Sequence, residues 1–405
     1  MLRRDFLQVS AGLSVALATP GALAQSGTPA AKAAQSAAES AAAGGPARWD
    51  RILVVVELKG ANDGLNTVIP FADPHYAPLR GPLAIAPERI VQLTPRVGLH
   101  PALKGLVESW QGRDLAIVQG IGYPYPNRSH FRSIEIWDTA SASSQTLTEG
   151  WLAQAFEGVK RPAGRAIDAV VVDTNALPAT GGDLHTIVMQ DAESFIQQAR
   201  ALRDGNAPPP ANPALAHVMK VRGEIHAASL GLAERMRGAP APAHAFATDP
   251  FSHQLALATR ILLAKVPVVA IKVALGGFDT HARQLEIHDR LLAQLGDGLA
   301  MFRRNLIAAG LWQDVLVMTY SEFGRRVKPN ASGGTDHGAA APHFMMGGAV
   351  KGGLHGAYPS LADLQDGDLK HTVDFRDVYA TVARRWWGLE ETFGRRNPTM
   401  VDFLA

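Results

Sequence analysis

Four short, mostly apolar runs constrain this chain most, because each leads into a loop with acidic, histidine or hydroxyl side chains. Runs of this length without polar alternation suit β-strands that are buried on both faces. Segments with helical periodicity lie between them. We therefore expect an α/β fold with a mostly parallel central sheet and helices on both faces. The runs span residues 52–56, 115–118, 266–273 and 315–318.

The polar loops predict a single site. Parallel strands bring their carboxyl ends to one edge of a sheet, and ligands bind at that edge in open α/β sheets. Random placement would scatter such side chains, whereas here they recur at four strand ends. The candidate residues are Asp63, Ser129, Asp279 with His281, and Glu322 with Asp336 and His337.

These loops offer donors for a divalent metal. Asp279 and His281 follow a Gly-Gly turn and lie two residues apart, so in an extended segment they point the same way and can share one ion. Oxygen and nitrogen donors suit zinc, calcium or manganese, and the sequence does not choose among them. The structural alternative is that Glu322 caps a helix and that Asp336 and His337 form an ordinary turn.

Asp63 and Ser129 each have two interpretations. Asp63 lies in an Asn-Asp-Gly turn, which is common loop chemistry, but it also follows the first run. A helix is predicted to start near Ser129, because apolar residues at helical spacing follow a proline-rich loop. Ser129 is therefore either an N-cap or a nucleophile whose hydroxyl is deprotonated because a bound metal lowers its pKa. In the second case Arg128 or His130 lies near the developing negative charge.

The N-terminus has the pattern of a twin-arginine secretory signal. Arg3 and Arg4 precede a modestly apolar segment, and Ala22-Leu23-Ala24 provides a cleavage site before Gln25. We expect export by the twin-arginine translocase to the periplasm or the medium. The apolar segment is too short to span a bilayer, so an integral membrane protein is not expected. The alternative is a short amphipathic helix that belongs to the fold.

The rest of the chain is expected to form one domain. Residues 25–47 form an Ala/Ser/Gly tract without large apolar side chains, which is typical of a flexible linker after the signal at 1–24. Residues 48–405 are assigned to a single α/β domain. Within it, prolines mark surface connections between helical segments, and residues 174–250 are a candidate cap over the site.

Composition excludes several classes of function. The 39 basic residues nearly balance the 37 acidic residues, so no strong field favours nucleic acid or an anionic membrane. The chain has no cysteine, which rules out disulfides, thiolate metal ligands and a cysteine nucleophile. An apolar fraction of 47% in 405 residues is enough for a large core.

Five motifs together resemble a known family. With the twin-arginine start, GANDGLNT, NRSHF, GGFDTH, SEFGRR and GGTDHG resemble the exported bacterial family called domain of unknown function 1501, from about Arg51 to the end of the chain. That family is in turn similar to the alkaline phosphatase and sulfatase superfamily. The resemblance implies an alkaline-phosphatase-like fold. It also implies Asp63 as the first-strand ligand, Ser129 as the nucleophile, Asp279 and His281 as a later pair, and His337 in the closing loop.

The sequence departs from the superfamily at one position. Many members carry Asp-His at the end of the penultimate core strand, where this chain has Glu322-Phe323. Alternatively, Asp336 and His337 are that pair, displaced along the chain. A single ion or an altered pair is therefore expected in place of a full two-zinc site.

Three functions are consistent with these patterns. The leading one is an exported metal-dependent hydrolase of phosphate or sulfate esters with a serine nucleophile, acting on a phosphorylated or sulfated small molecule or glycan. The second is a catalytically inactive, carbohydrate- or polymer-binding protein that keeps the fold, which Glu322-Phe323 favours. The third is an accessory protein for a co-exported partner.

Overall fold

The computed structural model describes residues 46–201 and 212–404. The predicted signal peptide and almost all of the predicted linker lie outside the described residues. In the two described ranges, no helix combines the length and the apolar character needed to cross a bilayer.

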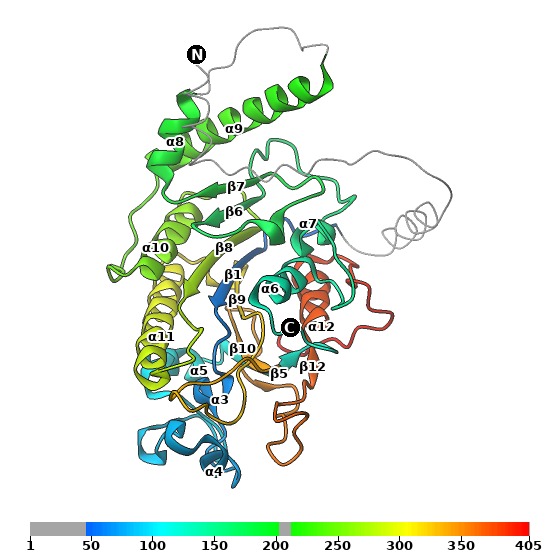
Figure 1. Cartoon of the computed structure of the whole chain (residues 1–405). Coiled ribbons are helices and arrows are strands. Elements are labelled where there is room, and N and C mark those ends of the chain that lie inside the picture. Colours follow the sequence, from blue (N-terminus) through cyan, green and yellow to red (C-terminus); the bar gives the residue numbers. More distant parts are fainter. Residues whose placement is uncertain (1–45, 202–211, 405) are drawn as a thin grey trace, which may run out of the picture.

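Nine strands form the central sheet (Figure 1). They are β1 (Ile52–Lys59), β5 (Leu115–Gly122), β6 (Ala169–Val172), β7 (Thr186–Met189), β8 (Ala270–Gly276), β9 (Val315–Tyr320), β10 (Ala341–Met346), β11 (Gly353–His355) and β12 (Val373–Asp374). Their order is β11-β5-β10-β9-β1-β8-β6-β7, with β12 also paired to β5. Since β10 alone runs antiparallel to its neighbours in this sheet, the predicted mostly parallel sheet is confirmed. A small separate sheet contains β2 (Val68–Ile69), β3 (Val91–Gln92) and β4 (Gly98–Leu99).

Each of the four apolar runs becomes a strand. β1 comes first in the chain but lies in the interior of the sheet, between β8 and β9 and parallel to both. The run at 266–273 starts later than predicted, because β8 begins only at Ala270. Pro267 explains the delay, since proline has no N–H to donate to a strand ladder.

Ten α-helices surround the sheets in the described ranges. They are α3 (Gly64–Thr67), α4 (Tyr76–Arg80), α5 (Val107–Gln111), α6 (His130–Thr139), α7 (Trp151–Ala155), α8 (Ala192–Ala201), α9 (Pro213–Arg237), α10 (Pro250–Leu263), α11 (Gln284–Ala308) and α12 (Phe375–Thr381). A π-helical segment continues α12 over Val382–Trp387. The predicted start of a helix at Ser129 is confirmed, since α6 begins at the next residue.

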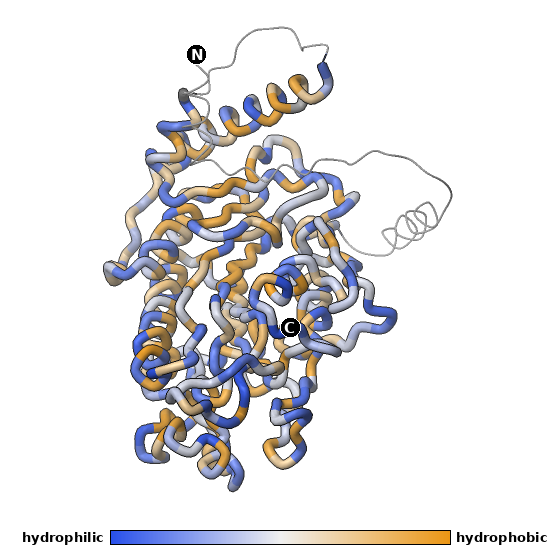
Figure 2. Tube along the Cα trace, viewed as in Figure 1, coloured by the Kyte–Doolittle hydropathy of each residue, from blue (hydrophilic) through white to orange (hydrophobic). Residues whose placement is uncertain are grey.

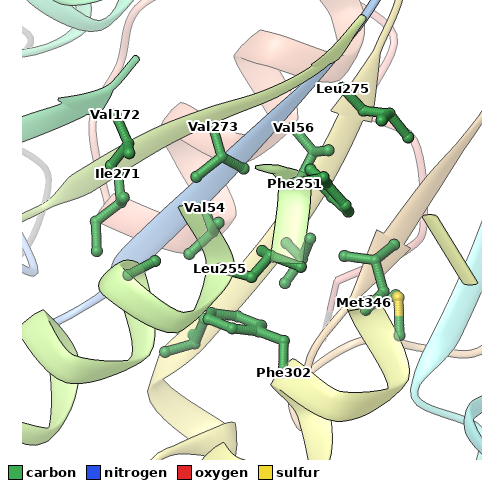
Figure 3. Packing of buried hydrophobic residues seen from close by; sticks show 14 of the residues in the cluster. Val54, Val56, Val172, Phe251, Leu255, Ile271, Val273, Leu275, Phe302 and Met346 are labelled. Atoms are coloured by element: carbon green, nitrogen blue, oxygen red, sulfur yellow. The ribbon is translucent and has the colours of Figure 1, made fainter. Parts of the chain in front are cut away.

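Two apolar layers cover the two faces of the sheet. Alternate β1 residues Val54 and Val56 face the layer with α10 and α11, where Phe251 and Phe302 pack against them (Figure 3). The intervening residues of β1 face the layer that contains α6, α7 and α12. Figure 2 shows the hydrophobic residues concentrated along the central strands. Helices thus cover both faces, as predicted.

The α8–α9 pair lies beyond β7 at one end of the sheet (Figure 1). Phe195 of α8 and Leu232 of α9 are buried in the layer on the α10 side. Most of the region suggested as a cap is located here. Its first residues lie elsewhere, because Thr174 donates to Glu57 of β1 and Asn175 accepts from Lys272 of β8.

His343 on β10 gives a testable pH dependence. Its ring is 1% exposed, neither ring nitrogen has a partner among the described residues, and burial lowers its pKa to about 3. The unfolded chain takes up a proton near pH 6.5, whereas the folded chain stays neutral until about pH 3. Stability is therefore lost as pH falls through this window, at up to about 1.4 kcal/mol per pH unit.

We expect His343→Leu to weaken this dependence. Between pH 7 and 4.5, urea denaturation should show a loss of unfolding free energy about 2 kcal/mol smaller in the variant than in the wild type. His253→Gln, at an exposed position of α10, should keep the wild-type dependence. Equal losses in wild type and His343→Leu would show that His343 is not the responsible group.

Candidate metal centre

Side chains from three loops meet at the carboxyl edge of the sheet. His130 begins α6 after β5, Asp279 and His281 follow β8, and His337 lies in the loop after β9. The Nε2 atom of His337 is 2.9 Å from Nε2 of His281 and 3.0 Å from Nε2 of His130. Oδ1 of Asp279 is 3.3 Å from the Nε2 atoms of His130 and His337 and 3.0 Å from that of His281. In the described ranges, His130, Asp279 and His337 form a group able to hold a metal ion, with ligand atoms within 4.8 Å of one another.

The second ring nitrogen of each of these histidines faces an oxygen atom. The Nδ1 contacts are His130 to Glu322 Oε1 at 2.6 Å, His337 to the backbone oxygen of Arg128 at 2.8 Å, and His281 to Asp336 Oδ1 at 3.2 Å. Carbonyl and ionised carboxylate oxygens can only accept, so each Nδ1 carries the proton. A neutral ring then has its lone pair on Nε2, which is the arrangement that second-shell partners impose on metal-binding histidines.

Four lone pairs therefore converge, three from imidazole rings and one from Asp279. A proton on one ring could satisfy one close contact and would leave acceptors facing one another in the others. A cation removes this conflict. The separations of 2.9–3.3 Å fit neighbouring ligands that each lie about 2 Å from one ion.

Arg325 ties the surrounding loops together. It is 2% exposed, and its guanidinium donates to acceptors on three different segments. These acceptors are the backbone oxygens of Gly60, Ala61 (2.8 Å), Phe278 (3.1 Å) and Thr335 (2.8 Å), and Oδ1 of Asp279 (2.6 Å). The position of Asp279 thus depends on Arg325.

Close backbone packing holds the same region. Gly60 has φ +106°, and a Cβ atom there would lie 2.4 Å from the backbone nitrogen of Asp279. Its N–H donates to Oε1 of Glu322 at 2.9 Å, the oxygen that also faces His130. Any larger residue at position 60 would push the β1 and β8 loops apart.

The local charges shift several pKa values. Burial raises the pKa of Asp279, but the hydrogen bond and charge of Arg325, with His130 and His281, outweigh it and bring that pKa to about 2. The hydrogen bond to Glu322 raises the pKa of His130. Burial lowers the pKa of His337, which keeps that ring neutral and able to offer a lone pair.

Asp63 is not among these groups, contrary to the ligand role expected from the sequence. It is fully buried, and its oxygens accept from Arg80, from Gln284 and from the N–H of Leu65 at 3.1 Å. Burial alone would raise the pKa of Asp63, but the charges of Arg80 and His288 and the hydrogen bonds lower it. Asp63 therefore caps α3 and forms a buried ion pair with Arg80.

Ser129 directly precedes His130 in the chain. It is exposed and occupies the N-cap position of α6, but its side chain makes no capping hydrogen bond. The hydroxyl has no hydrogen bond to any described residue. Arg128, which was expected near a developing charge, turns its guanidinium to Asp368 and contributes its backbone oxygen to His337.

The structure thus separates the seven acidic and histidine candidates into three groups. Asp279, His281 and His337 converge as expected. His130, for which the sequence suggested a catalytic role, adds its Nε2 atom to the same group as a possible metal ligand. Glu322 and Asp336 do not supply converging atoms but orient the rings of His130 and His281. Asp63 stands apart. Arg325 was missed, although its place in SEFGRR, directly after a buried strand, is a signal that could have drawn attention to it.

Comparison with known proteins gives low similarities to solved structures. The lipoteichoic acid synthase LtaP from Listeria monocytogenes is 10% identical, with 85% of this chain and 75% of that chain covered and a TM-score of 0.40. The PsFucS1 sulfatase from Pseudoalteromonas sp. is 9% identical, with coverages of 87% and 70% and a TM-score of 0.35. A phosphonate monoester hydrolase of Agrobacterium radiobacter is 12% identical, with coverages of 84% and 74% and a TM-score of 0.31.

No curated protein matches the sequence. The family model described as protein of unknown function, DUF1501, matches residues 109–397. This range holds four of the five motifs that suggested the family, and it covers well over half of the chain. The protein therefore belongs to the DUF1501 family.

Proposed function

We propose that this protein hydrolyses phosphate or sulfate esters at one divalent metal ion, with Ser129 as the nucleophile. His130, Asp279 and His337 would hold the ion, with His281 completing or bordering the site. One observation carries the proposal: three imidazole lone pairs and a carboxylate oxygen converge, and one of these rings belongs to His130, which directly follows Ser129 in the sequence. Such a site suits a reaction in which negative charge develops on an attacked ester.

Zinc fits this set of donors best. Three nitrogens and one carboxylate oxygen are typical zinc ligands, whereas calcium takes six or more oxygen ligands. Glu322, Asp336 and the backbone oxygen of Arg128 would orient the rings, and Arg325 would hold Asp279. When bound, the ion supplies a Lewis acid that stabilises the negative charge on the ester oxygens.

The chain's own residues account for the remaining steps. The oxygen of Ser129 forms a bond to phosphorus or sulfur, the bond to the alcohol breaks, and the departing alcohol takes up the proton that the hydroxyl releases. Water then cleaves the seryl ester and regenerates Ser129. Free N–H groups at the start of α6 would bind the non-bridging oxygens, as helix N-termini do for anions.

Export through the twin-arginine translocase is part of the same proposal. The pattern around Arg3 and Arg4 supports it, as does the cleavage site before Gln25. The translocase carries folded proteins, so the metal would be taken up before the chain leaves the cytoplasm. The substrate would then be met in the periplasm or outside the cell.

Replacement of Ser129 tests the chemistry. A panel of phosphate and sulfate monoesters is assayed with zinc, manganese or calcium added. We expect Ser129→Ala to lower kcat by at least about a thousandfold. Metal content should be unchanged, and stability should fall by less than the roughly 1 kcal/mol that loss of a capping serine costs, because Ser129 makes no capping bond.

Ser144→Ala, at an exposed position beyond α6, is the matched control and should keep wild-type activity. A fully active Ser129→Ala enzyme would remove the nucleophile role and favour direct attack by water. A wild-type protein that holds one zinc ion and hydrolyses none of the esters would instead support the binding protein without catalysis.

A further inference from the structure

Two aromatic side chains project from the segment that also supplies His130. Tyr125 is 89% exposed and Phe131 is 85% exposed. The other exposed large hydrophobic residues in the described ranges are aliphatic, and none is more than 50% exposed. Aromatic rings contribute large areas to binding when a partner covers them. The proposed chemistry at Ser129 uses neither ring.

The backbone holds Tyr125 in this exposed position. Pro124 and Pro126 flank it, and its φ of +55° is an unusual value for a residue with a side chain. The hydroxyl of Tyr123 anchors the loop, because it accepts from the N–H of Asn127 at 3.0 Å and lies 2.8 Å from the hydroxyl of Ser133. The exposed ring is therefore presented by a fixed loop, which lowers the entropy cost of binding.

The two rings offer separate flat surfaces. No ring contact joins Tyr125 to Phe131 or either of them to another described aromatic residue. The residues between them are mainly polar: Asn127, Arg128, Ser129 and His130.

This alternation fits a chain of sugar rings. A pyranose has an apolar C–H face that stacks on an aromatic ring and a hydroxyl edge that forms hydrogen bonds. Two separate aromatic rings suit two sugar rings of a polymer, whereas a mononucleotide has only one base to stack. A bilayer would require a contiguous apolar patch, and here two isolated rings lie among polar side chains.

We infer that Tyr125 and Phe131 bind neighbouring sugar rings of an anionic glycan whose phosphate or sulfate group lies at the metal centre. The inference rests on the proposed function for the position of the ester group. It makes the substrate a phosphorylated or sulfated oligosaccharide or polysaccharide, and it makes the loop at 123–131 its binding surface next to the metal.

Affinity electrophoresis tests this inference with the purified mature protein in its metal-bound form. Native gels contain dextran sulfate, chondroitin sulfate, carrageenan or phosphorylated mannan, and unmodified dextran serves as the neutral reference. At least one anionic glycan should retard the wild type. Its Kd should rise about tenfold or more in the double variant Tyr125→Ala/Phe131→Ala. Because both side chains are exposed, circular dichroism should show an unchanged fold.

Two further variants separate stacking from other effects. The aromatic double variant Tyr125→Trp/Phe131→Tyr should bind within about threefold of the wild type, since flat faces are kept. Leu230→Ala removes an exposed aliphatic side chain on α9 and should change nothing. Equal retardation of the wild type and the alanine double variant would overturn the inference, because charge alone would then explain binding. Absence of retardation in every anionic glycan would also overturn it.

Ester hydrolysis is measured separately, with small monoesters that carry no sugar. A protein that cleaves these esters but binds no glycan retains the proposed function and loses this inference. A protein that binds a glycan through Tyr125 and Phe131 but cleaves no ester retains glycan binding by these rings and loses the proposed hydrolytic function. The two failures are therefore distinguishable.

Discussion

His337→Ala is expected to abolish stoichiometric metal binding. The Nε2 atom of His337 contacts all three other converging groups, His281, His130 and Asp279, at 2.9–3.3 Å. Its removal takes away the ring nitrogen that contacts all the other groups, and it leaves Oδ1 of Asp279 as the atom that lies close to both His130 and His281. We expect the metal content after purification, measured by inductively coupled plasma mass spectrometry, to fall from about one ion per chain to a small fraction.

The same change should remove the stabilisation that metal provides. A ligand that binds only the folded state stabilises it by about 4 kcal/mol when present at a thousand times its Kd. Added zinc should therefore raise the Tm of the wild type and leave that of His337→Ala unchanged. His244→Ala, at an exposed position, should behave like the wild type. Retention of one ion by His337→Ala would show that the convergence is not a metal site.

Arg325→Met is expected to be the most destabilising single change near the site. The side chain is buried, and its loss leaves four backbone oxygens without this donor, whereas the exposed carboxylate of Asp279 can turn to water. An unsatisfied buried acceptor costs roughly 1–3 kcal/mol. The sum is comparable to the whole stability of a typical domain, about 5–15 kcal/mol, so we expect little folded protein.

Arg325→Lys keeps the prediction measurable if the methionine variant does not fold. Lysine has a single charged group with three donors, so it cannot reach all the acceptors that the planar guanidinium serves. In guanidinium denaturation, its loss of unfolding free energy should be about 3 kcal/mol or more. Arg326→Ala, at the neighbouring and partly exposed position, should cost less than about 1 kcal/mol. Similar losses of unfolding free energy for both positions would show that Arg325 does not hold the three loop segments together.

Local patterns were sufficient to predict four strands of the central sheet, β1, β5, β8 and β9, and the start of α6. An apolar run such as 315–318 has few alternatives to a buried strand, and parallel strands must end at one edge. The meeting of Asp279, His281 and His337 followed from that geometry. The sequence spacing of Asp279 and His281 further favoured a common direction, which the structure shows.

The partners of each side chain depended on long-range packing and were not predictable in the same way. Asp63 leaves the first strand like a ligand, but Gln284 and Arg80 contact it in the fold and satisfy its charge. His130 was assigned a catalytic role because its neighbour Ser129 was the nucleophile candidate. Which of its nitrogens points to His337 depends on Glu322, which is 192 residues away in sequence.

The position of β1 in the sheet has a consequence for how the chain folds. β1 is among the first segments of the domain to be synthesised, but its two neighbours, β8 and β9, come from the second half of the chain. Contacts between such distant segments are slow to form, because a long loop must close first. The centre of the sheet therefore assembles only after β9 has been made, so the domain completes folding late, after most of the chain has left the ribosome.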